Sequence, residues 1–302
     1  MWIVFFEMSP FFNRIKLSHR FIAKTANEWT TKFFAFVGLL SLFVSFEGIF
    51  SDSRDFWYKL LIAVVIIAVV WLVCALIVTM KVGCQKKKKV VEGQNGKGVY
   101  VVYGDIFDPS IVNNQKRYIA FAVNRCFDTI VDDNLVGATS VHGLAFNRLY
   151  KQGLYTTRSL NTALQGAMKL NPNYVVLSRS EKPAGNLKRY EVGAYANLPI
   201  DSKLNYLLLG LTCFDSNLNA HTSKQDYALS IQKMIEMLDM EAQCYPVLMP
   251  IIGAGRARAD LKEREALEYI IEAFKINQSR ITSDVYIVVY ESAQNRVSIA
   301  DL

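Results

Sequence analysis

The chain of 302 residues has only three histidines and five cysteines. The cysteines are scattered without a CxxC pair, and no group of cysteine and histidine has the spacing of a zinc site. These absences argue against a structural zinc ion and against a disulfide framework, so we expect a reducing compartment. We also expect no metal and no resident cofactor.

The sequence also lacks the familiar motifs of nucleotide enzymes and hydrolases. The glycine-rich turn at residues 253–255 is followed by Arg258, where a Rossmann fingerprint needs glycine or alanine. No lysine and Ser/Thr follow its glycine as in a Walker loop, and neither G-x-S-x-G nor H-E-x-x-H occurs. Dehydrogenase, P-loop NTPase, serine hydrolase and zinc protease functions are therefore excluded.

Long apolar runs are present, and they gather before residue 81. Residues 60–80 carry no charge, whereas residues 33–50 carry Glu47 near their end. A membrane-spanning helix needs about 20 largely apolar residues. We predict two transmembrane helices, residues 33–50 and 60–80, joined as a tight hairpin. Small residues on one face of the first span would let copies pack closely: Gly38, Ser41, Ser45 and Gly48.

Basic residues flank the two spans on the outside of the pair rather than in the loop between them. The positive-inside rule therefore places the N-terminus and the C-terminal domain in the cytoplasm. Residues 1–32 are expected to include a basic helix lying on the membrane, with a disordered basic arm as the alternative. We interpret Lys86–Lys89 as an anchor at anionic headgroups, with a nucleic-acid patch as the alternative.

Residues 81–98 form a basic, glycine-containing linker, and residues 99–302 form one domain. Apolar strands alternate there with helices, which predicts an α/β sheet covered on both faces, with ligands at the carboxyl ends of its strands. One predicted helix has Asp260 as N-cap and Glu263 at N3. The predicted strands are residues 99–103, 118–124, 174–178, 190–196, 206–214, 245–252 and 284–290, and the helices are 225–239 and 260–275.

Five short pieces of this domain occur in a particular order. They are Gly104-Asp105-Ile106, Asn124, a loop with Gly137, Asn197-Leu198-Pro199, and Pro250-Ile251-Ile252-Gly253-Ala254-Gly255. Each alone has an ordinary structural interpretation as a turn, cap or strand end. Together, over about residues 99–291, they resemble the macro domain, an ADP-ribose-binding module. The resemblance implies a three-layer α/β/α fold with a mixed central sheet.

The resemblance also assigns ligand-binding residues. Asp105 would contact adenine, Ile106 would add a backbone contact, Tyr290 would pack on the adenine, and Asn124 would lie near the distal ribose. The diphosphate would lie on two segments: Val136, Gly137, Ala138, Thr139 and Ser140, and Gly253, Ala254, Gly255 and Arg256.

Hydrolytic macro domains carry a run of glycines after the asparagine, whereas this chain has only Gly137 early in that loop. Three aspartates follow Asn124, but none aligns with a catalytic role. We therefore assign no catalytic residue and expect binding rather than catalysis. A membrane-tethered ADP-ribosyl hydrolase and a passive ADP-ribose-binding scaffold are the alternatives.

Two spans followed by a cytosolic macro domain resemble the membrane effectors of type II Thoeris anti-phage defence. The resemblance implies that a partner TIR-domain enzyme makes an ADP-ribose signal, histidine-linked in that family, and that the macro domain senses it. The protein would then form a homo-oligomer, disrupt the bacterial inner membrane and cause abortive infection. No nucleic-acid partner is implied.

Overall fold

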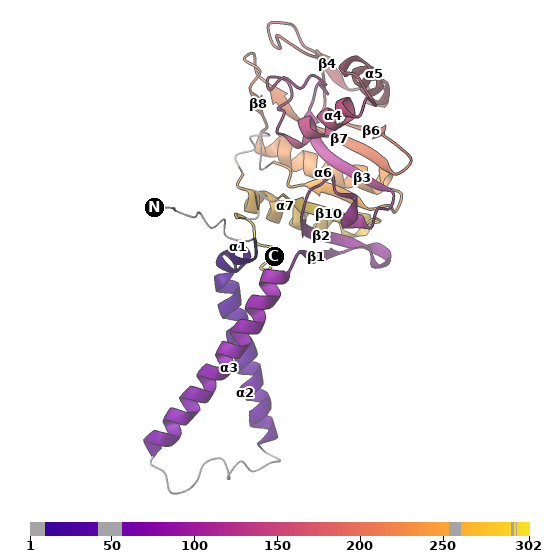
Figure 1. Cartoon of the computed structure of the whole chain (residues 1–302). Helices are drawn as coiled ribbons and strands as arrows, with labels where there is room; N and C mark the ends of the chain where they lie inside the picture. The colour runs from indigo at the N-terminus through magenta and orange to yellow at the C-terminus, as the bar shows by residue number, and fades with distance from the viewer. Residues whose placement is uncertain (1–9, 42–55, 254–260, 291–292, 294) are drawn as a thin grey trace. The chain divides into compact units, whose positions relative to one another are not determined.

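The structure is a computed structural model that describes residues 10–41, 56–253, 261–290, 293 and 295–302. The chain divides into two compact units (Figure 1). A helical unit contains residues 1–86 and 298–302, and an α/β unit contains residues 87–297. The chain therefore passes from the helical unit into the α/β unit, and its last five residues belong to the helical unit again.

The helical unit contains three described helices: α1 (Pro10–Leu17), α2 (His19–Leu40) and α3 (Phe56–Cys84). Among the described residues, Trp57–Cys84 is the one stretch long and apolar enough to cross a membrane, with a mean hydropathy of 3.4. The predicted span 60–80 lies inside it. Of the predicted span 33–50, residues 33–40 belong to α2, and residues 42–55, with Ser45, Glu47 and Gly48, lie outside the described residues.

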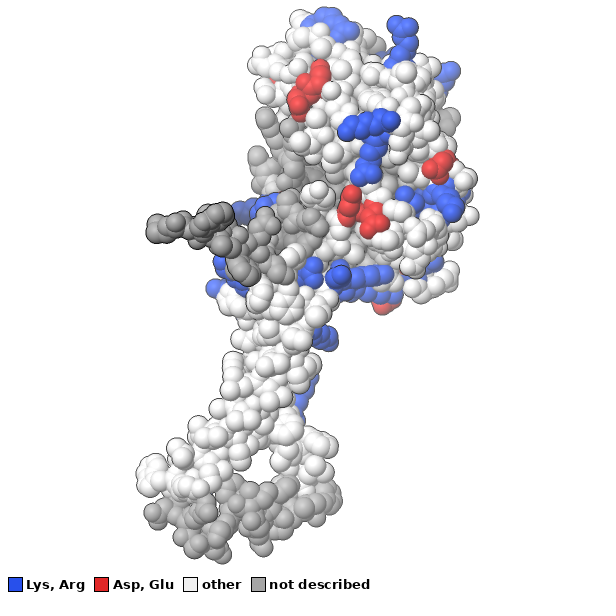
Figure 2. Space-filling view, viewed as in Figure 1, with Lys and Arg blue, Asp and Glu red and all other residues white. Residues whose placement is uncertain are grey.

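Helix α2 begins earlier than the sequence pattern indicates. Residues 19–32 were predicted to belong to a separate basic segment, but α2 is continuous from His19 to Leu40. The helix is charged in its first half and apolar in its second, so a composition change at residue 32 is not a structural boundary. Figure 2 shows this unit as mostly uncharged surface with lysine and arginine side chains along one side.

Helix α1 covers the C-terminal end of α3. Arg14 is buried and donates from Nη1 to the carbonyls of Gly83, at 3.1 Å, and Gln85, at 3.4 Å. These bonds satisfy carbonyl groups that have no partner at a helix end. A Cβ atom at Gly83 would lie 2.2 Å from the Phe11 ring, so glycine is needed for this close approach.

The C-terminal residues pack on the same helices. The hydroxyl groups of Ser18 and Ser298 lie 2.6 Å apart and are buried. Ala300 belongs to a small apolar cluster together with Ile22, Val78 and Val82. These contacts explain why the last residues of the chain count with the helical unit.

The α/β unit is built on a mixed sheet in the order β1-β2-β10-β9-β3-β7-β6, with β8 paired to β7. The four inner pairings, from β2 to β7, are parallel, whereas β1 and β6 join the edges antiparallel. The strands of this sheet are β1 (Lys87–Glu92), β2 (Gly98–Tyr103), β3 (Arg117–Asn124), β6 (Tyr195–Pro199), β7 (Leu204–Phe214), β8 (Ala220–His221), β9 (Val247–Pro250) and β10 (Val285–Val289).

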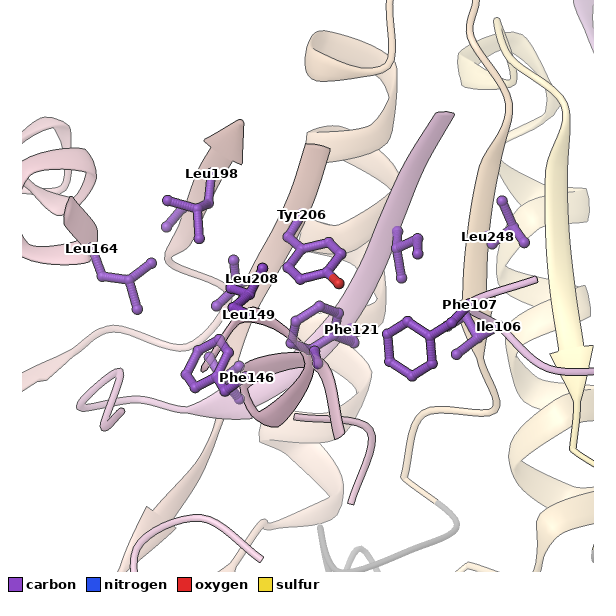
Figure 3. Packing of buried hydrophobic residues seen from close by; sticks show 14 of the residues in the cluster. Ile106, Phe107, Phe121, Phe146, Leu149, Leu164, Leu198, Tyr206, Leu208 and Leu248 are labelled. Carbon is purple, nitrogen blue, oxygen red and sulfur yellow. The ribbon is translucent and has the colours of Figure 1, made fainter. Parts of the chain in front are cut away.

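Helices cover both faces of the sheet, as the sequence predicts. Side chains alternate along β3, so Ile119 and Phe121 join the core under α4 (Val141–Lys151) and α5 (Thr157–Ala167), together with Phe146 and Leu164 (Figure 3). On β7, Leu207 is also fully buried, but it points to the face of α6 (Lys224–Glu241) and α7 (Glu263–Ile276). The two faces make the three-layer α/β/α architecture.

Two strand predictions were wrong in detail. Residues 174–178 were predicted as a core strand, but β4 (Tyr174–Val176) is exposed and pairs only with β5 (Lys188–Tyr190) in a separate sheet. Residues 190–196 do not form one strand, because β5 ends at Tyr190 and β6 begins at Tyr195. A short apolar run does not by itself distinguish a buried strand from an exposed hairpin.

Strand β1 lies inside the segment that was predicted to be a linker. The Lys87 ammonium lies 4.0 Å from the ring centre of Tyr100 and 4.5 Å from that of Tyr286, which is a cation–π arrangement. Burial lowers the pKa of Lys87. The lysine run thus supplies an edge strand whose charges discourage pairing with other chains.

The start of α7 also differs from its prediction. Its N-cap is Lys262, whose backbone N–H donates to the carboxylate of Glu265 at 3.1 Å. The predicted N3 residue, Glu263, is instead the first residue of the helix. Asp260, the predicted N-cap, lies outside the described residues.

Candidate functional site

Four neighbouring parallel strands end at the same edge of the sheet, and predicted site residues follow each of them. Asp105 comes after β2, Asn124 ends β3, Gly253 comes after β9 and Tyr290 comes after β10. Ligands of open α/β sheets bind outside the carboxyl ends of their strands. The topology therefore brings residues that are far apart in sequence to one side of the domain.

An open cleft of about 590 Å³ lies at this edge. Its size falls in the range of small-molecule sites, about 300–1,000 Å³. Of the predicted residues, Asn124, Val136, Gly137, Ser140 and Gly253 line it. The complete lining is residues 121–124, 133–137, 140–142, 212, 214, 217–220 and 250–253.

The β3 end of the cleft depends on Asn124, which is only 4% exposed. Its Oδ1 accepts from the backbone N–H groups of Cys126, at 3.1 Å, and Asp128, at 3.3 Å. Its Nδ2 donates to the Leu135 carbonyl at 3.4 Å. Asn124 therefore borders the cleft, but its amide holds the shape of the loop that follows β3.

A buried ion pair fixes the same loop, and sequence reasoning gave it no role. Lys182 and Asp128 have side chains that are 0% and 1% exposed, with Nζ 2.9 Å from Oδ2. Lys182 also donates to the Ala184 carbonyl at 2.8 Å, and Asp128 accepts from the Asn186 N–H at 2.6 Å. Gly185 has φ +76°, and a Cβ there would lie 2.2 Å from Oδ1 of Asp128. Both the buried ammonium and the buried carboxylate therefore have hydrogen-bond partners, as buried charges require.

The loop from residue 132 to 140 is folded by short side chains. Asp132 accepts from the Leu135 N–H at 2.8 Å, and Asp133, at φ +64°, accepts from the Ala138 N–H at 2.9 Å. Ser140 then caps α4, because its Oγ accepts from the Gly143 N–H at 3.0 Å. The loop is thus ordered by its own bonds, and it directs the N-terminus of α4 to the cleft. A helix N-terminus favours anions such as phosphate.

His142 lies in the first turn of α4 and lines the cleft, a position that no sequence pattern indicated. It is 7% exposed and packs edge-on against Phe146, with ring centres 4.5 Å apart. Burial lowers the pKa of His142 to about 3, although a hydrogen bond with the backbone of Asp128 opposes the shift. The ring is therefore neutral at ordinary pH, and its buried Nε2 has no hydrogen-bond partner among the described residues.

The β2 end is organised differently. Asp105 Oδ1 accepts from the Phe107 N–H at 3.0 Å, so the residue makes the turn bond that the sequence left open. Its Oδ2 lies 3.3 Å from Nη2 of Arg148. Ile106 points into the core (Figure 3), and Tyr290 is 57% exposed. These residues, together with Ala138 and Thr139, lie outside the cleft lining.

The glycine turn after β9 is described only at its start. Gly253 has φ +93°, and a Cβ there would lie 2.4 Å from the ring of Tyr227. The Tyr227 hydroxyl donates to the Ile252 carbonyl at 2.9 Å, which fixes the turn against α6. Ala254, Gly255 and Arg256 lie outside the described residues.

The described cleft offers no activated nucleophile from cysteine. Cys126 is buried beside Asn124, and burial raises the pKa of its thiol to about 12. A thiol with that pKa is not a thiolate at neutral pH and does not attack substrates. Among the described residues, no group of three histidine, cysteine, aspartate or glutamate side chains is placed to hold a metal.

Comparison with known proteins agrees with this architecture. Residues 99–290 match the family described as Thoeris protein ThsA, Macro domain. The chain belongs to this family. It is a Thoeris anti-phage defence protein with a macro domain, and the resemblance of the C-terminal domain to a Thoeris macro domain is confirmed.

Individual relatives are distant in sequence. The Thoeris protein ThsA of Bacillus amyloliquefaciens (strain Y2) is 22% identical over 286 residues, which cover 92% of this chain and 89% of that protein. A mutant Oceanobacillus iheyensis macrodomain is 12% identical, with 70% of this chain and 93% of that chain covered and a TM-score of 0.40. The same macrodomain with ADP is 13% identical, with the same shares covered and a TM-score of 0.32.

Proposed function

We propose that this protein is a sensor that binds an ADP-ribose-type nucleotide in the macro-domain cleft and then acts on a membrane through its helical unit. The observation that carries the proposal is the placement of a bonded loop and the α4 N-terminus at the cleft of a chain in the Thoeris family. Apolar α3, joined to β1 by two residues, supports the membrane part.

The ligand would lie across the carboxyl ends of the strands. Its diphosphate would be held by the loop from Val136 to Ser140 and by the turn that begins at Gly253, and its adenine would lie toward Asp105 and Tyr290. Asn124 and neutral His142 lie on the β3 side, where the distal ribose and any attached group would fit. A TIR-domain enzyme that consumes NAD would supply this nucleotide, carrying histidine on the distal ribose.

Binding changes the membrane only if the ligand prefers the active state. Moving a protein from mostly inactive to mostly active needs about a 10⁴-fold preference, or about 5.5 kcal/mol. Assembly of several copies would divide that requirement among several bound ligands. We therefore propose that the active form is a homo-oligomer in the bacterial inner membrane, with both chain ends cytoplasmic, and that its assembly disrupts the membrane and ends the infection.

Dye release from liposomes that contain the full-length protein tests the proposal. ADP-ribose and histidine-linked ADP-ribose are added in parallel, and the expected result is release that depends on nucleotide concentration. Tight binding without release would support a passive scaffold. The absence of both binding and release would contradict the sensor function.

A charge placed beside the diphosphate loop sharpens the test. Thr139 is exposed and precedes the α4 cap, so Thr139→Glu brings a carboxylate near the phosphates without burying it. We expect nucleotide affinity to fall more than about tenfold, because like charges repel at a binding site. Thr139→Gln, which has the same size without the charge, is the matched control. Calorimetry that shows equal affinities for the two variants would move the diphosphate away from α4.

The hydrolase alternative makes a different prediction. A catalytic asparagine needs its amide for substrate or water, but the Asn124 amide already bonds three backbone groups of its own loop. We expect nucleotide to be recovered unchanged after long incubation with the protein. Turnover that is lost in Asn124→Ala while binding persists would establish the enzyme instead.

A further inference from the structure

Helix α2 has two different faces. Ile22, Ala26 and Thr30 are buried on the side toward α3. The exposed side carries polar and charged residues. At 100° per residue, five of them fall within an arc of about 100°: Arg20, Lys24, Asn27, Glu28 and Thr31. Lys32 lies beside this arc. Lys24, Asn27, Glu28, Thr31 and Lys32 also line a shallow hollow on this surface.

The uncharged length of helix α3 indicates how deep each of its residues lies in a membrane. Its charges are Lys59 and Lys81, so the 21 residues between them are uncharged. At 1.5 Å per residue they extend about 32 Å, which matches a hydrocarbon core of about 30 Å. Trp71 is ten residues from Lys81, or about 15 Å, and therefore lies near the middle of the core.

One hydrogen bond places a residue of α2 at the same depth as Trp71. The Trp71 Nε1 donates to Oδ1 of Asn27 at 2.6 Å. The helices run antiparallel beside each other, because Ile22 packs with Val78 and Val82. Asn27 therefore lies near the middle of the bilayer whenever α3 spans it, which places residues before the predicted first span, 33–50, inside the membrane. Lys24, Glu28 and Lys32 lie within about 8 Å of Asn27 along the axis.

Lipid is an unsuitable environment for this face. Ionised side chains at bilayer depth face a protein interior or a water-filled cavity rather than lipid. Helix α3 has no charged group at this depth to pair with them. Glu28 stands four residues from both Lys24 and Lys32, so it can neutralise one of them but not both. Lys32 also leans back toward the middle, because side chains on a helix point toward its N-terminus.

We propose that, in the membrane-active assembly, the polar faces of α2 from several copies face one another and line a water-filled path for ions, while α3 faces the lipid. This inference rests on the proposed function, which says that copies assemble but not what lines the lesion. Three basic side chains and one acidic side chain per copy make the lining positive. Rings of lysine and arginine favour anions.

Current measurement in planar bilayers tests the lining. The full-length protein is opened with ADP-ribose, or with its histidine-linked form, under an asymmetric potassium chloride gradient. The expected reversal potential has the sign of chloride permeation. Lys24→Glu/Lys32→Glu should reverse that sign, whereas the matched control Lys16→Glu/Lys169→Glu, which changes two exposed lysines outside the path, should keep it.

Calorimetric nucleotide binding and flotation with liposomes show whether each variant is folded and inserted. If the double glutamate variant does not insert, Lys24→Gln/Lys32→Gln replaces it and should abolish the preference for chloride. Current that is unselective in the wild type, or unchanged in its selectivity in the lysine variants, would overturn the lining and leave the sensor function intact. No current in the wild type would contradict both.

Discussion

The β3 end of the candidate site keeps its polar groups buried and bonded to one another, whereas the β2 end, outside the cleft lining, leaves them in solvent. Asn124 and Asp128 are 4% and 1% exposed, but the side chain of Asp105 is 44% exposed and Tyr290 is 57% exposed. The β3 end is thus shaped before a ligand arrives, which lowers the cost of ordering it on binding. Substitutions there should act on folding, and substitutions at the β2 end should act on affinity.

The largest effect is expected from breaking the buried pair at the β3 end. Asp128→Ala leaves the Lys182 ammonium buried without its partner, which typically costs about 3–5 kcal/mol of unfolding free energy. Thermal unfolding of the full chain in detergent should show a large loss of stability. Asp128→Leu/Lys182→Met removes both charges and should recover most of it. Equal instability of the single and double variants would show that packing, not charge, holds the loop.

Sequence could predict the β3 and β9 ends of the cleft because strand periodicity marks where each strand stops, whereas Asp105 and Ile106 after β2 lie outside its lining. Asn124, Ser140 and Gly253 therefore line the cleft as expected. The Asp128–Lys182 pair could not be predicted, because 54 residues separate the partners and Lys182 lies in an irregular segment. The position of Lys182 depends on tertiary packing, which local sequence patterns do not predict.

The fold shows the same limit. The α/β/α layers followed from alternating apolar strands and helices, but β1 was missed because Lys87, Lys88 and Lys89 look like a linker or a membrane anchor. Its pairing with β2 and the stacking of Lys87 on Tyr100 and Tyr286 are long-range contacts. In α2, conversely, a change of composition at residue 32 suggested a boundary where the helix simply continues.

A smaller effect is expected at the exposed β2 end. Asp105→Asn keeps an oxygen to accept the Phe107 N–H but removes the negative charge that would strengthen a hydrogen bond accepted from the amino group of adenine. We expect ADP-ribose affinity to fall about tenfold, because bonds to charged groups are stronger than neutral ones. Stability should change by less than about 1 kcal/mol, because the Arg148 pair is exposed.

Calorimetry with ADP-ribose and with ribose 5-phosphate, which lacks adenine, separates this role from a general charge effect. The second ligand should bind both proteins equally. An equal loss for both ligands would show that Asp105 acts through its charge on the whole site, and a large fall in melting temperature would show that the two ends of the cleft do not differ as proposed.

The smallest expected effect concerns pH and His142 at the buried end. Its pKa is about 3 in the folded protein and about 6.5 when unfolded, so the unfolded chain binds the extra proton between these values. The stability that comes from the neutral ring is complete above pH 6.5 and falls as the pH drops toward 3. One pH unit below 6.5, the loss is about 1.4 kcal/mol.

His142→Phe removes this titration and keeps a ring against Phe146, although it gives up the bond to the Asp128 backbone. The melting temperature of the variant should therefore fall less than that of the wild type between pH 7.5 and 5.5, whatever their difference at neutral pH. Parallel curves would mean that the folded protein accommodates the charged ring, and the contrast between a closed β3 end and an open β2 end would then be weaker than the burial of His142 indicates.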